Sequence, residues 1–309
     1  MPVNIGILSL SYCAGCEVAL ISTRLFRELL TSGSLRIAYS TLLVDKEELG
    51  DVDVLVVTGS VRAREDVVSL REAVKKARLI VTFGSCACFG GVPGLANIAR
   101  REELIRGVYG VVEPSVTGSR PELTRFVIPV SAITEVNYVV PGCPPPDSLI
   151  EALLNSLVNR GEYTLPSTSV CNECPLNTGE KKPQRELRRK LLTLHVIDTS
   201  TCFLKQGVVC MGPATRGGCS ALCPKRGSPC TGCMGPLPGS RDQAADIIDA
   251  LGGVFYSVEP SEKILEAVPD PLGLFSMYTL PYSTIPYHKK VGVMHNEGDA
   301  DKDQASDAN

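Results

Sequence analysis

The stretch Leu79-Ile-Val-Thr-Phe-Gly-Ser-Cys86 is a short apolar run that ends in a glycine, a serine and a cysteine. A continuous run without polar alternation is typical of a strand that is covered on both faces of a parallel sheet. The glycine ends the predicted strand at Phe83, and Cys86 then lies in the turn that follows. A buried strand with a cysteine-bearing turn behind it is therefore the unit from which we interpret the rest of the chain.

Two other segments repeat this unit. Val3–Ser9 precedes a turn with Cys13 and Cys16, and Val136–Val140 precedes Pro141-Gly142-Cys143-Pro144. Strands that alternate with helices predict βαβ units and an α/β fold with a parallel sheet. The other predicted strands are Leu35–Leu43 and Val52–Val57, and the predicted helices are Val18–Leu30, Asp66–Ala77 and Asp147–Asn159.

The three cysteine-bearing turns are expected to meet at one edge of this sheet. In open α/β sheets, ligands bind in the crevice outside the carboxyl ends of the strands. Four thiols at that edge would make one complete metal site, although free cysteines are also among the most buried small residues in protein cores. For Cys88 we favour this structural interpretation. The four candidate ligands are Cys13, Cys16, Cys86 and Cys143.

Composition excludes several classes of function. The 309 residues suffice for about two domains of roughly 150 residues each, and a net charge of -3 gives no basic surface for nucleic acid. The chain has no tryptophan and only 5% aromatic residues, which leaves little for stacking on bases. No apolar run approaches the length of a membrane span, and the N-terminal residues do not resemble an export signal. We expect a cytoplasmic protein that binds neither nucleic acid nor membrane.

The cysteines are the unusual feature of the composition. There are 13 of them, and eight lie between Cys171 and Cys233. In a reducing compartment such a density indicates metal binding rather than disulfides. The histidines (His195, His288 and His295) have no zinc-finger spacing, so zinc sites would have to be almost entirely thiolate. Zinc and iron–sulfur both remain open at this point.

The chain changes character after the predicted helix at Asp147–Asn159. From Ser167 onward it is rich in Cys, Gly and Pro, and only Arg241–Leu251 has helical periodicity. We expect this region to have too few apolar residues to form a core, so metal sites would have to stabilise its fold. The basic run Lys181–Lys190 is interpreted as a solvated helix face. The expected domains are 1–165, an irregular metal-binding domain at 166–295, and an acidic disordered tail at 296–309.

The spacing of the C-terminal cysteines predicts two further sites of four ligands each. Thiolates suit iron–sulfur clusters as well as zinc, and a 4Fe–4S cluster takes four of them. Three such sites in all would use twelve of the 13 cysteines. The pairs are Cys171-x2-Cys174, Cys202-x7-Cys210, Cys219-x3-Cys223 and Cys230-x2-Cys233.

The motifs together resemble the small subunit of nickel-iron hydrogenases over about residues 3 to 240. The residues that carry the resemblance are Cys13-Ala-Gly-Cys16-Glu17, Gly84-Ser85-Cys86-Ala87, Pro141-Gly142-Cys143-Pro144-Pro145, Cys210-Met-Gly-Pro213-Ala-Thr215 and Pro229-Cys230-Thr-Gly-Cys233. The resemblance implies a flavodoxin-like domain with a proximal cluster and a second domain with a medial and a distal cluster. It also implies that the nickel-iron centre lies in a separate large subunit.

Carried over by position, the resemblance implies three sets of cluster ligands. Cys171 stands where periplasmic relatives have a histidine, and Cys223 stands where they have a proline. We therefore expect a medial 4Fe–4S cluster in place of a three-iron one. The implied proximal ligands are Cys13, Cys16, Cys86 and Cys143; the distal ligands are Cys171, Cys174, Cys202 and Cys210; the medial ligands are Cys219, Cys223, Cys230 and Cys233.

The all-cysteine ligand set and the absence of an export signal resemble the cytoplasmic branch of this family. That branch includes methyl-viologen-reducing (non-deazaflavin-reducing) hydrogenases and sulfhydrogenases. The resemblance implies electron transfer from H2 oxidation to a downstream iron–sulfur or flavin protein, with heterodisulfide reductase as one such acceptor.

Two acidic positions need separate interpretation. Many relatives have an acidic residue before the glycine at Gly59, and here Thr58 replaces it, so any proton-handling role of that carboxylate does not transfer. Glu17 is a candidate for a proton route or for support of the cluster ligands. The simpler interpretation is a carboxylate at a helix N-terminus, where the helix dipole favours it.

Three other functions stay open. A complex I-type subunit would share the flavodoxin-like half but lack the eight C-terminal cysteines. A polyferredoxin would repeat a compact Cys-x2-Cys-x2-Cys-x3-Cys run, which this sequence lacks. A zinc-stabilised interaction protein would contain no acid-labile sulfide.

Overall fold

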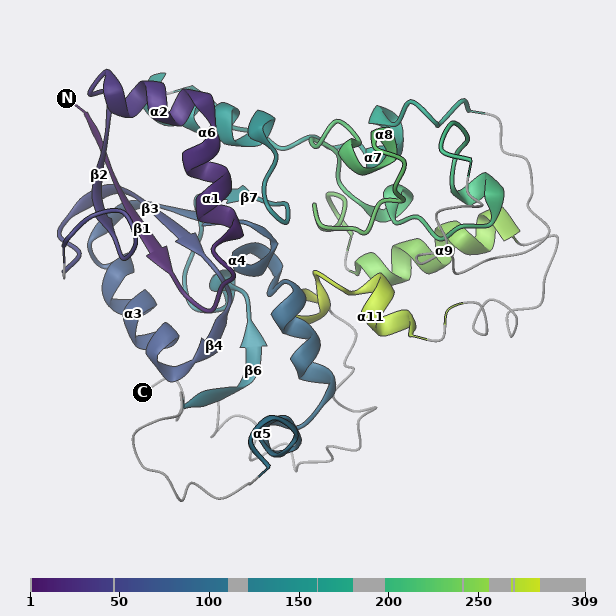
Figure 1. Ribbon diagram of the computed structural model, residues 1–309, viewed down its shortest axis with the longest axis horizontal. Coiled ribbons are helices and arrows are strands. Elements are labelled where there is room, and N and C mark those ends of the chain that lie inside the picture. The colour runs from purple at the N-terminus through teal and green to yellow at the C-terminus, as the bar shows by residue number, and fades with distance from the viewer. Residues whose placement is uncertain are drawn as a thin grey trace.

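The computed structural model describes residues 2–46, 48–110, 122–159, 161–179, 198–240, 242–255, 268 and 270–283. Its centre is a five-stranded sheet in the order β2-β1-β3-β5-β7, in which every neighbouring pair is parallel (Figure 1). This is the flavodoxin-like order, so the predicted fold class is confirmed. The strands are β1 (Val3–Ser9), β2 (Leu35–Ser40), β3 (Val52–Thr58), β5 (Ala77–Phe83) and β7 (Tyr138–Val140).

Both faces of the sheet are covered, which explains the continuous apolar strands. Ile7 and Val56 belong to one buried core with α1 (Gly15–Ser22), α2 (Arg24–Thr31) and α6 (Asp147–Asn159). Leu8 and Val57, one residue further along each strand, belong to a second core with α3 (Arg64–Val74). Successive side chains of a strand point to opposite faces, so a strand between two layers must be apolar throughout.

The single helix expected at Val18–Leu30 is wrong, because the chain forms two helices there. Thr23 has an extended conformation (φ -64°, ψ 129°) and separates α1 from α2. Its hydroxyl contacts the Ala19 carbonyl oxygen and the Asp147 carboxylate, both at 3.0 Å. Asp147 begins α6, so a contact from 124 residues away accompanies a break that helical periodicity did not indicate.

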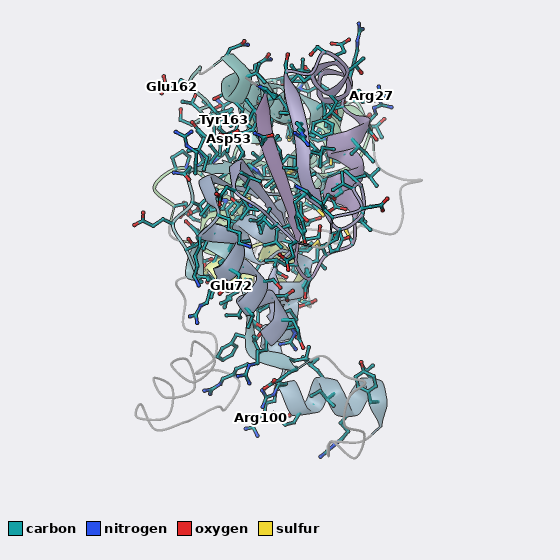
Figure 2. The ribbon with its side chains drawn as sticks, turned by 90° about the vertical axis from the view of Figure 1, so that its left-hand side faces the viewer. Arg27, Asp53, Glu72, Arg100, Glu162 and Tyr163 are labelled. Carbon is teal, nitrogen blue, oxygen red and sulfur yellow. The ribbon has the colours of Figure 1, made fainter. Side chains whose placement is uncertain are left out.

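Several elements were not expected from the sequence. β4 (Val61–Ala63) and β6 (Leu123–Ile128) form a separate antiparallel pair. α5 (Arg101–Tyr109), which follows Arg100, extends away from the main body and has no buried residue (Figure 2). The helix predicted at Arg241–Leu251 is confirmed as α9 (Gln243–Phe255). The other helical segments are α4 (Ser85–Phe89), α7 (Val170–Glu173), α8 (Leu222–Lys225), α11 (Pro271–Phe275), η1 (Val92–Ile98), η2 (Val130–Ala132), η4 (Leu204–Gln206), η5 (Gly212–Ala214) and η6 (Leu280–Tyr282).

The second half has its own apolar core, contrary to our expectation. Phe203, Met211, Ile247, Leu251 and Phe275 are all buried in one cluster. Their spacing is irregular because short helical turns and loops, rather than long helices, carry most of them. Buried cysteines belong to this core as well, so candidate ligands also contribute to its packing.

The two halves of the chain also share packing. Met234 is buried in the same core as α6, and Cys219 and Cys233 pack against that core. The domain boundary near residue 165 stays a prediction. Lys181–Lys190, the three histidines and the tail at 296–309 lie outside the described residues. Among the described helices, none has the length and apolarity needed to cross a lipid bilayer.

Candidate metal centres

The first group of cysteines lies at the carboxyl edge of the sheet, as predicted. Cys13 follows β1, Cys16 is in the first turn of α1, Cys86 is in the first turn of α4, and Cys143 follows β7. Burial raises the pKa of the Cys16 thiol, and the charges of Cys86, Cys143, Cys13 and, least of all, Cys88 raise it further. Each of these thiols is thus close enough to interact electrostatically with Cys16.

Glycines allow the backbone to approach these sulfur atoms. Gly84 has a φ of +89°, and a Cβ atom there would collide with Cys16 Sγ. Gly91 has a φ of +63°, and its Cβ would lie 2.5 Å from Cys86 Sγ. Side chains other than glycine rarely adopt such φ values, so both the conformation and the space require glycine.

Cys88 also interacts electrostatically with Cys16 and Cys86, but its hydrogen bonds distinguish it from this group. It is buried, and its thiol lies 3.4 Å from Thr82 Oγ1 and 3.6 Å from the Thr82 carbonyl oxygen. Burial raises its pKa to about 12, while the hydrogen bond to Thr82 acts in the opposite direction. A neutral thiol inside the fold suits these contacts, and its structural role stays a prediction.

The second group contains Cys171, Cys174, Cys202 and Cys210. Burial raises the pKa of Cys171 to about 12, and the charges of Cys210, Cys202 and Cys174 contribute in that order. A Cβ atom on Gly212 would lie 3.1 Å from Cys171 Sγ and 3.6 Å from Cys210 Sγ. These two sulfur atoms, which come from distant parts of the sequence, therefore lie close together, on the same side of Gly212.

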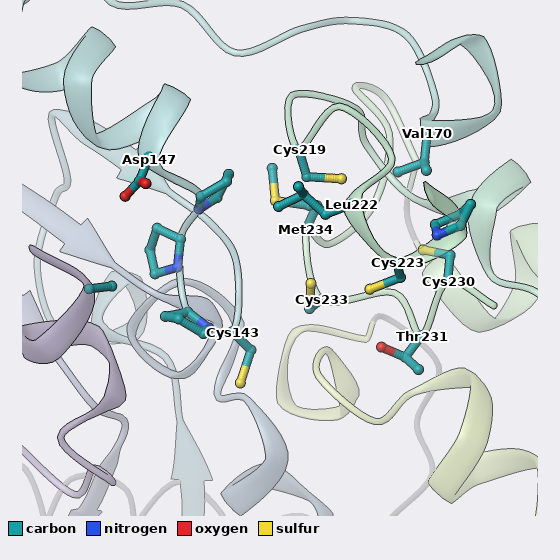
Figure 3. Close-up of a pocket in the computed structure, with 15 residues that line it drawn as sticks. Cys143, Asp147, Val170, Cys219, Leu222, Cys223, Cys230, Thr231, Cys233 and Met234 are labelled. Carbon is teal, nitrogen blue, oxygen red and sulfur yellow. The ribbon is translucent and has the colours of Figure 1, made fainter. Parts of the chain in front are cut away.

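The third group surrounds a cavity of about 370 Å³. Cys219, Cys223, Cys230 and Cys233 line it, and Cys143 of the first group lies at its opposite side (Figure 3). Burial raises the pKa of Cys233 to about 12, the charges of Cys223, Cys219 and Cys143 raise it further, and a hydrogen bond from the Cys143 amide opposes them. The first and third groups are thus direct neighbours.

Cys230 lies between the second and third groups. Its pKa is raised by burial first and then by the charges of Cys210 and Cys233. Its backbone amide also donates a hydrogen bond to Cys210 Sγ at 3.2 Å. The structure therefore brings together all twelve cysteines singled out from the sequence, in three adjoining groups, and Cys230 contacts two of them.

The chemistry of these donor sets fits clusters of iron. Thiols that raise one another's pKa are poor neighbours as anions unless a cation binds between them, and iron–sulfur clusters are held by such sets of four thiolates. Within the described residues, no three His, Cys, Asp or Glu side chains are arranged to hold a single metal ion. A cubane is a different kind of site, because each of its thiolates binds a separate iron atom.

Glu17 is buried, with only 3% of its surface exposed, and lies beside Cys16 in the first turn of α1. The Ser9 hydroxyl donates a hydrogen bond to Glu17 Oε1, and Glu17 Oε2 has no partner among the described residues. Both interpretations of Glu17, as a proton-route residue and as a carboxylate at a helix N-terminus, agree with this position. Its burial adds a reason to test the first of them.

Three polar residues near the cysteines were not singled out from the sequence. Glu173 Oε1 accepts a hydrogen bond from the Gly218 amide at 2.5 Å, which links the second group to the loop of Cys219. The buried Gln243 amide donates to the Gly232 carbonyl oxygen at 3.0 Å. The Ser85 hydroxyl donates to the Cys233 carbonyl oxygen at 2.6 Å. Glu173 and Ser85 adjoin a cysteine in the sequence, but this does not separate them from other such neighbours, and Gln243, ten positions after Cys233, had no signal in the sequence.

Comparison with known proteins gives concordant matches. The family model described as NADH ubiquinone oxidoreductase, 20 Kd subunit, matches residues 13–157. A vhu subunit of the F420-non-reducing hydrogenase of Methanocaldococcus jannaschii is 33% identical over 294 residues, which cover 92% of this chain and 97% of that protein. The iron-sulfur subunit of the F420-non-reducing hydrogenase of Archaeoglobus profundus is 30% identical over 319 residues, which cover 92% of this chain and 98% of that protein.

A solved structure is similar to part of the chain. It is a chain of an NAD+-reducing nickel-iron hydrogenase in the H2-reduced state, with 31% identity and a TM-score of 0.47. The match covers 54% of this chain and 96% of that chain.

Proposed function

This chain belongs to the family of nickel-iron hydrogenase small subunits that includes the F420-non-reducing hydrogenase subunits of these two organisms, and from this premise we propose that it holds three 4Fe–4S clusters. It is the electron-transferring subunit of a hydrogenase. When bound, such clusters supply one-electron oxidation and reduction at potentials that the surrounding protein adjusts. The observation that carries the proposal is the convergence of Cys13, Cys16, Cys86 and Cys143 from three separate strand ends.

The task of the chain itself is to hold three thiolate groups in a fixed order. The first group is open to a partner, because Cys13 and Cys143 are exposed at the edge of the sheet. We propose that the hydrogenase large subunit, with the nickel-iron centre, covers this edge. The third group lies next to Cys143 and the second lies next to Cys230, which gives the order first, third, second.

The second group is the proposed exit for electrons. Cys171, Cys174 and Cys202 are all partly exposed, so a redox partner that docks there would be close to the last set of ligands. We propose a downstream iron–sulfur or flavin protein, of which heterodisulfide reductase is one example, and a cytoplasmic complex. Glu17, buried beside the first group, is proposed to support a ligand or to carry protons.

Elemental analysis of the complex, purified without oxygen from its native source, tests this proposal. Three clusters predict about 12 iron atoms in this chain, nickel in the co-purifying large subunit and little zinc. Iron without nickel would favour a polyferredoxin or another catalytic partner. Zinc in place of iron would contradict the electron-transfer role of these cysteines.

A further inference from the structure

The three cysteine groups are connected to one another by hydrogen bonds as well as by packing. Ser85 lies between Gly84 and Cys86 and is almost completely buried, with 1% of its surface exposed. Its hydroxyl donates to the Cys233 carbonyl oxygen at 2.6 Å, across 148 positions of sequence. Its backbone amide donates to the Gly142 carbonyl oxygen at 2.9 Å, directly before Cys143. One serine therefore joins two loops of the first group to the third group.

The other end of the third group has a matching connection. The Cys230 amide donates to Cys210 Sγ at 3.2 Å, and the Met211 amide donates to the Cys230 carbonyl oxygen at 2.9 Å. Cys230 and Cys233 are the two ends of one turn, Cys230-Thr-Gly-Cys233. This turn is thus hydrogen-bonded to the first group at Cys233 and to the second group at Cys230.

We infer that the turn Cys230–Cys233 is the bonded route for electrons between the outer groups, and that Ser85 is the positioning residue that closes the route on the side of the first group. The inference rests on the proposed function, because it requires a redox cluster in each group. Each transfer moves one electron, so one group is oxidised as its neighbour is reduced, and two transfers follow each H2 that the hydrogenase oxidises. No covalent bond forms or breaks in this chain.

Physical reasons favour a bonded route over a gap. Electron tunnelling decays more steeply across empty space than along bonds, and the hydrogen bond from Ser85 spans the boundary at 2.6 Å. Gln243 supports the turn Cys230–Cys233, since its amide donates to the Gly232 carbonyl oxygen. The turn is therefore fixed at its ends and in its middle.

The test compares Ser85→Ala with the unchanged chain in the intact hydrogenase complex. Electron arrival at the third group is followed by rapid-freeze paramagnetic resonance after mixing with H2. We expect about tenfold slower arrival, the scale of losses when a supporting hydrogen bond near a metal site is removed. Iron content should not change, because all twelve cysteines are present. Ser85→Thr keeps the hydroxyl and should restore the rate.

Ser148→Ala is the matched control. The Ser148 hydroxyl also joins the two halves of the chain, through a 3.1 Å hydrogen bond to the Gly218 carbonyl oxygen, but it adjoins no cysteine of the first group. We expect an unchanged rate of electron arrival in this variant. A serine that acted only by holding the halves together would give similar losses at both positions.

Several results would overturn the inference. These are an unchanged rate in Ser85→Ala, an equal loss in Ser148→Ala, or a failure of Ser85→Thr to restore the rate while its iron is retained. Loss of about four iron atoms from Ser85→Ala would also overturn it, because Ser85 would then serve assembly rather than transfer. Failure of the proposed function is distinguishable, since the unchanged chain itself would then lack iron.

Discussion

The two halves of this chain position cysteines by different means. In the first half, the parallel ladder of β1, β3 and β5 fixes where each turn begins, and the cysteines follow the strand ends. In the second half, the cysteines lie in loops and in helices as short as α7 and α8, which have four residues each. A ladder of backbone hydrogen bonds can hold a turn without a ligand, whereas an irregular loop depends more on what its side chains bind.

The burial of the cysteines also differs between the two halves. Cys210 and Cys230 belong to the buried core of the second half, and Cys174, Cys202 and Cys219 pack against it. In the first half, Cys13 and Cys143 are exposed outside the cores. These candidate ligands of the second half therefore also contribute to its core, while Cys13 and Cys143 lie on a fold that the sheet already stabilises.

Iron removal should give the largest difference between the halves. We expect that anaerobic treatment with an iron chelator abolishes slow amide exchange in residues 198–240 and leaves it in β1, β3 and β5. Both halves lose their clusters, but the sheet keeps its ladder of backbone hydrogen bonds, whereas the loops depend on the bound clusters. Hydrogen–deuterium exchange measured on peptides from both halves checks this. Equal loss of protection in the sheet would contradict the comparison.

Gly84→Ala should separate cluster binding from folding in the first half. The new Cβ collides with Cys16 Sγ, which can rotate away when free but not when it is bound to iron. We expect loss of about four iron atoms with the sheet intact, measured by iron analysis and circular dichroism. Gly33→Ala is the matched control, because Gly33 also has a positive φ (+72°) but has nothing within 4 Å of the new Cβ.

The two glycine variants differ in backbone cost. Gly84 has a φ of +89° and a ψ of 157°, a conformation that is essentially restricted to glycine, so Gly84→Ala should lower the melting temperature more than Gly33→Ala. For Gly33→Ala we expect a cost of about 1–2 kcal/mol. Iron content is therefore the deciding measurement. Equal iron in the two variants would show that Cys16 does not bind metal with its sulfur directed at Gly84.

The sequence predicted the first half well because its signals are local. The run at 79–83 became β5, Val3–Ser9 became β1, and α6 begins at Asp147 and ends at Asn159 as expected. A strand covered on both faces must be apolar, and a turn behind it needs glycine, so each feature is visible in a few adjacent residues.

The remaining features depend on contacts between distant residues. The break at Thr23 accompanies a hydrogen bond to Asp147, and the connection of Ser85 to Cys233 spans 148 positions. The helical period at Arg241–Leu251 indicated α9, which supplies Ile247 and Leu251 to the core of the second half. The rest of this core collects single apolar residues from loops and short helical turns, which no helical or strand period indicates. Periodicity cannot detect such contacts, whereas the cysteine spacing could predict the ligand candidates because thiols are rare and chemically specific.

Cys223→Pro tests whether a loop ligand of the second half can be removed without loss of the loop. Cys223 lies in the first turn of α8, where a proline is tolerated because the amide hydrogen is not needed within the helix. We expect a three-iron cluster in place of the medial 4Fe–4S cluster, one iron atom fewer and a higher reduction potential. An oxidised resonance spectrum without a three-iron signal would contradict this, and Cys223→Ala, which lacks only the thiol, should match the proline variant.

Cys88→Ser should have the smallest effect. Cys88 is buried, as Cys210 and Cys230 of the second half are, but it lies beside the candidate ligands of the first half. A serine hydroxyl can keep the contact with the Thr82 carbonyl oxygen, so we expect a loss of stability of only about 1 kcal/mol and no loss of iron. Denaturant unfolding and iron analysis measure the two quantities. Cys86→Ser, two residues earlier in the same turn, should in contrast lose about four iron atoms. If Cys88→Ser also loses about four iron atoms, then Cys88 is itself needed to hold the cluster of the first group. The strand ends alone would then not determine which cysteines bind iron in the first half, which would contradict the contrast with the loops of the second half.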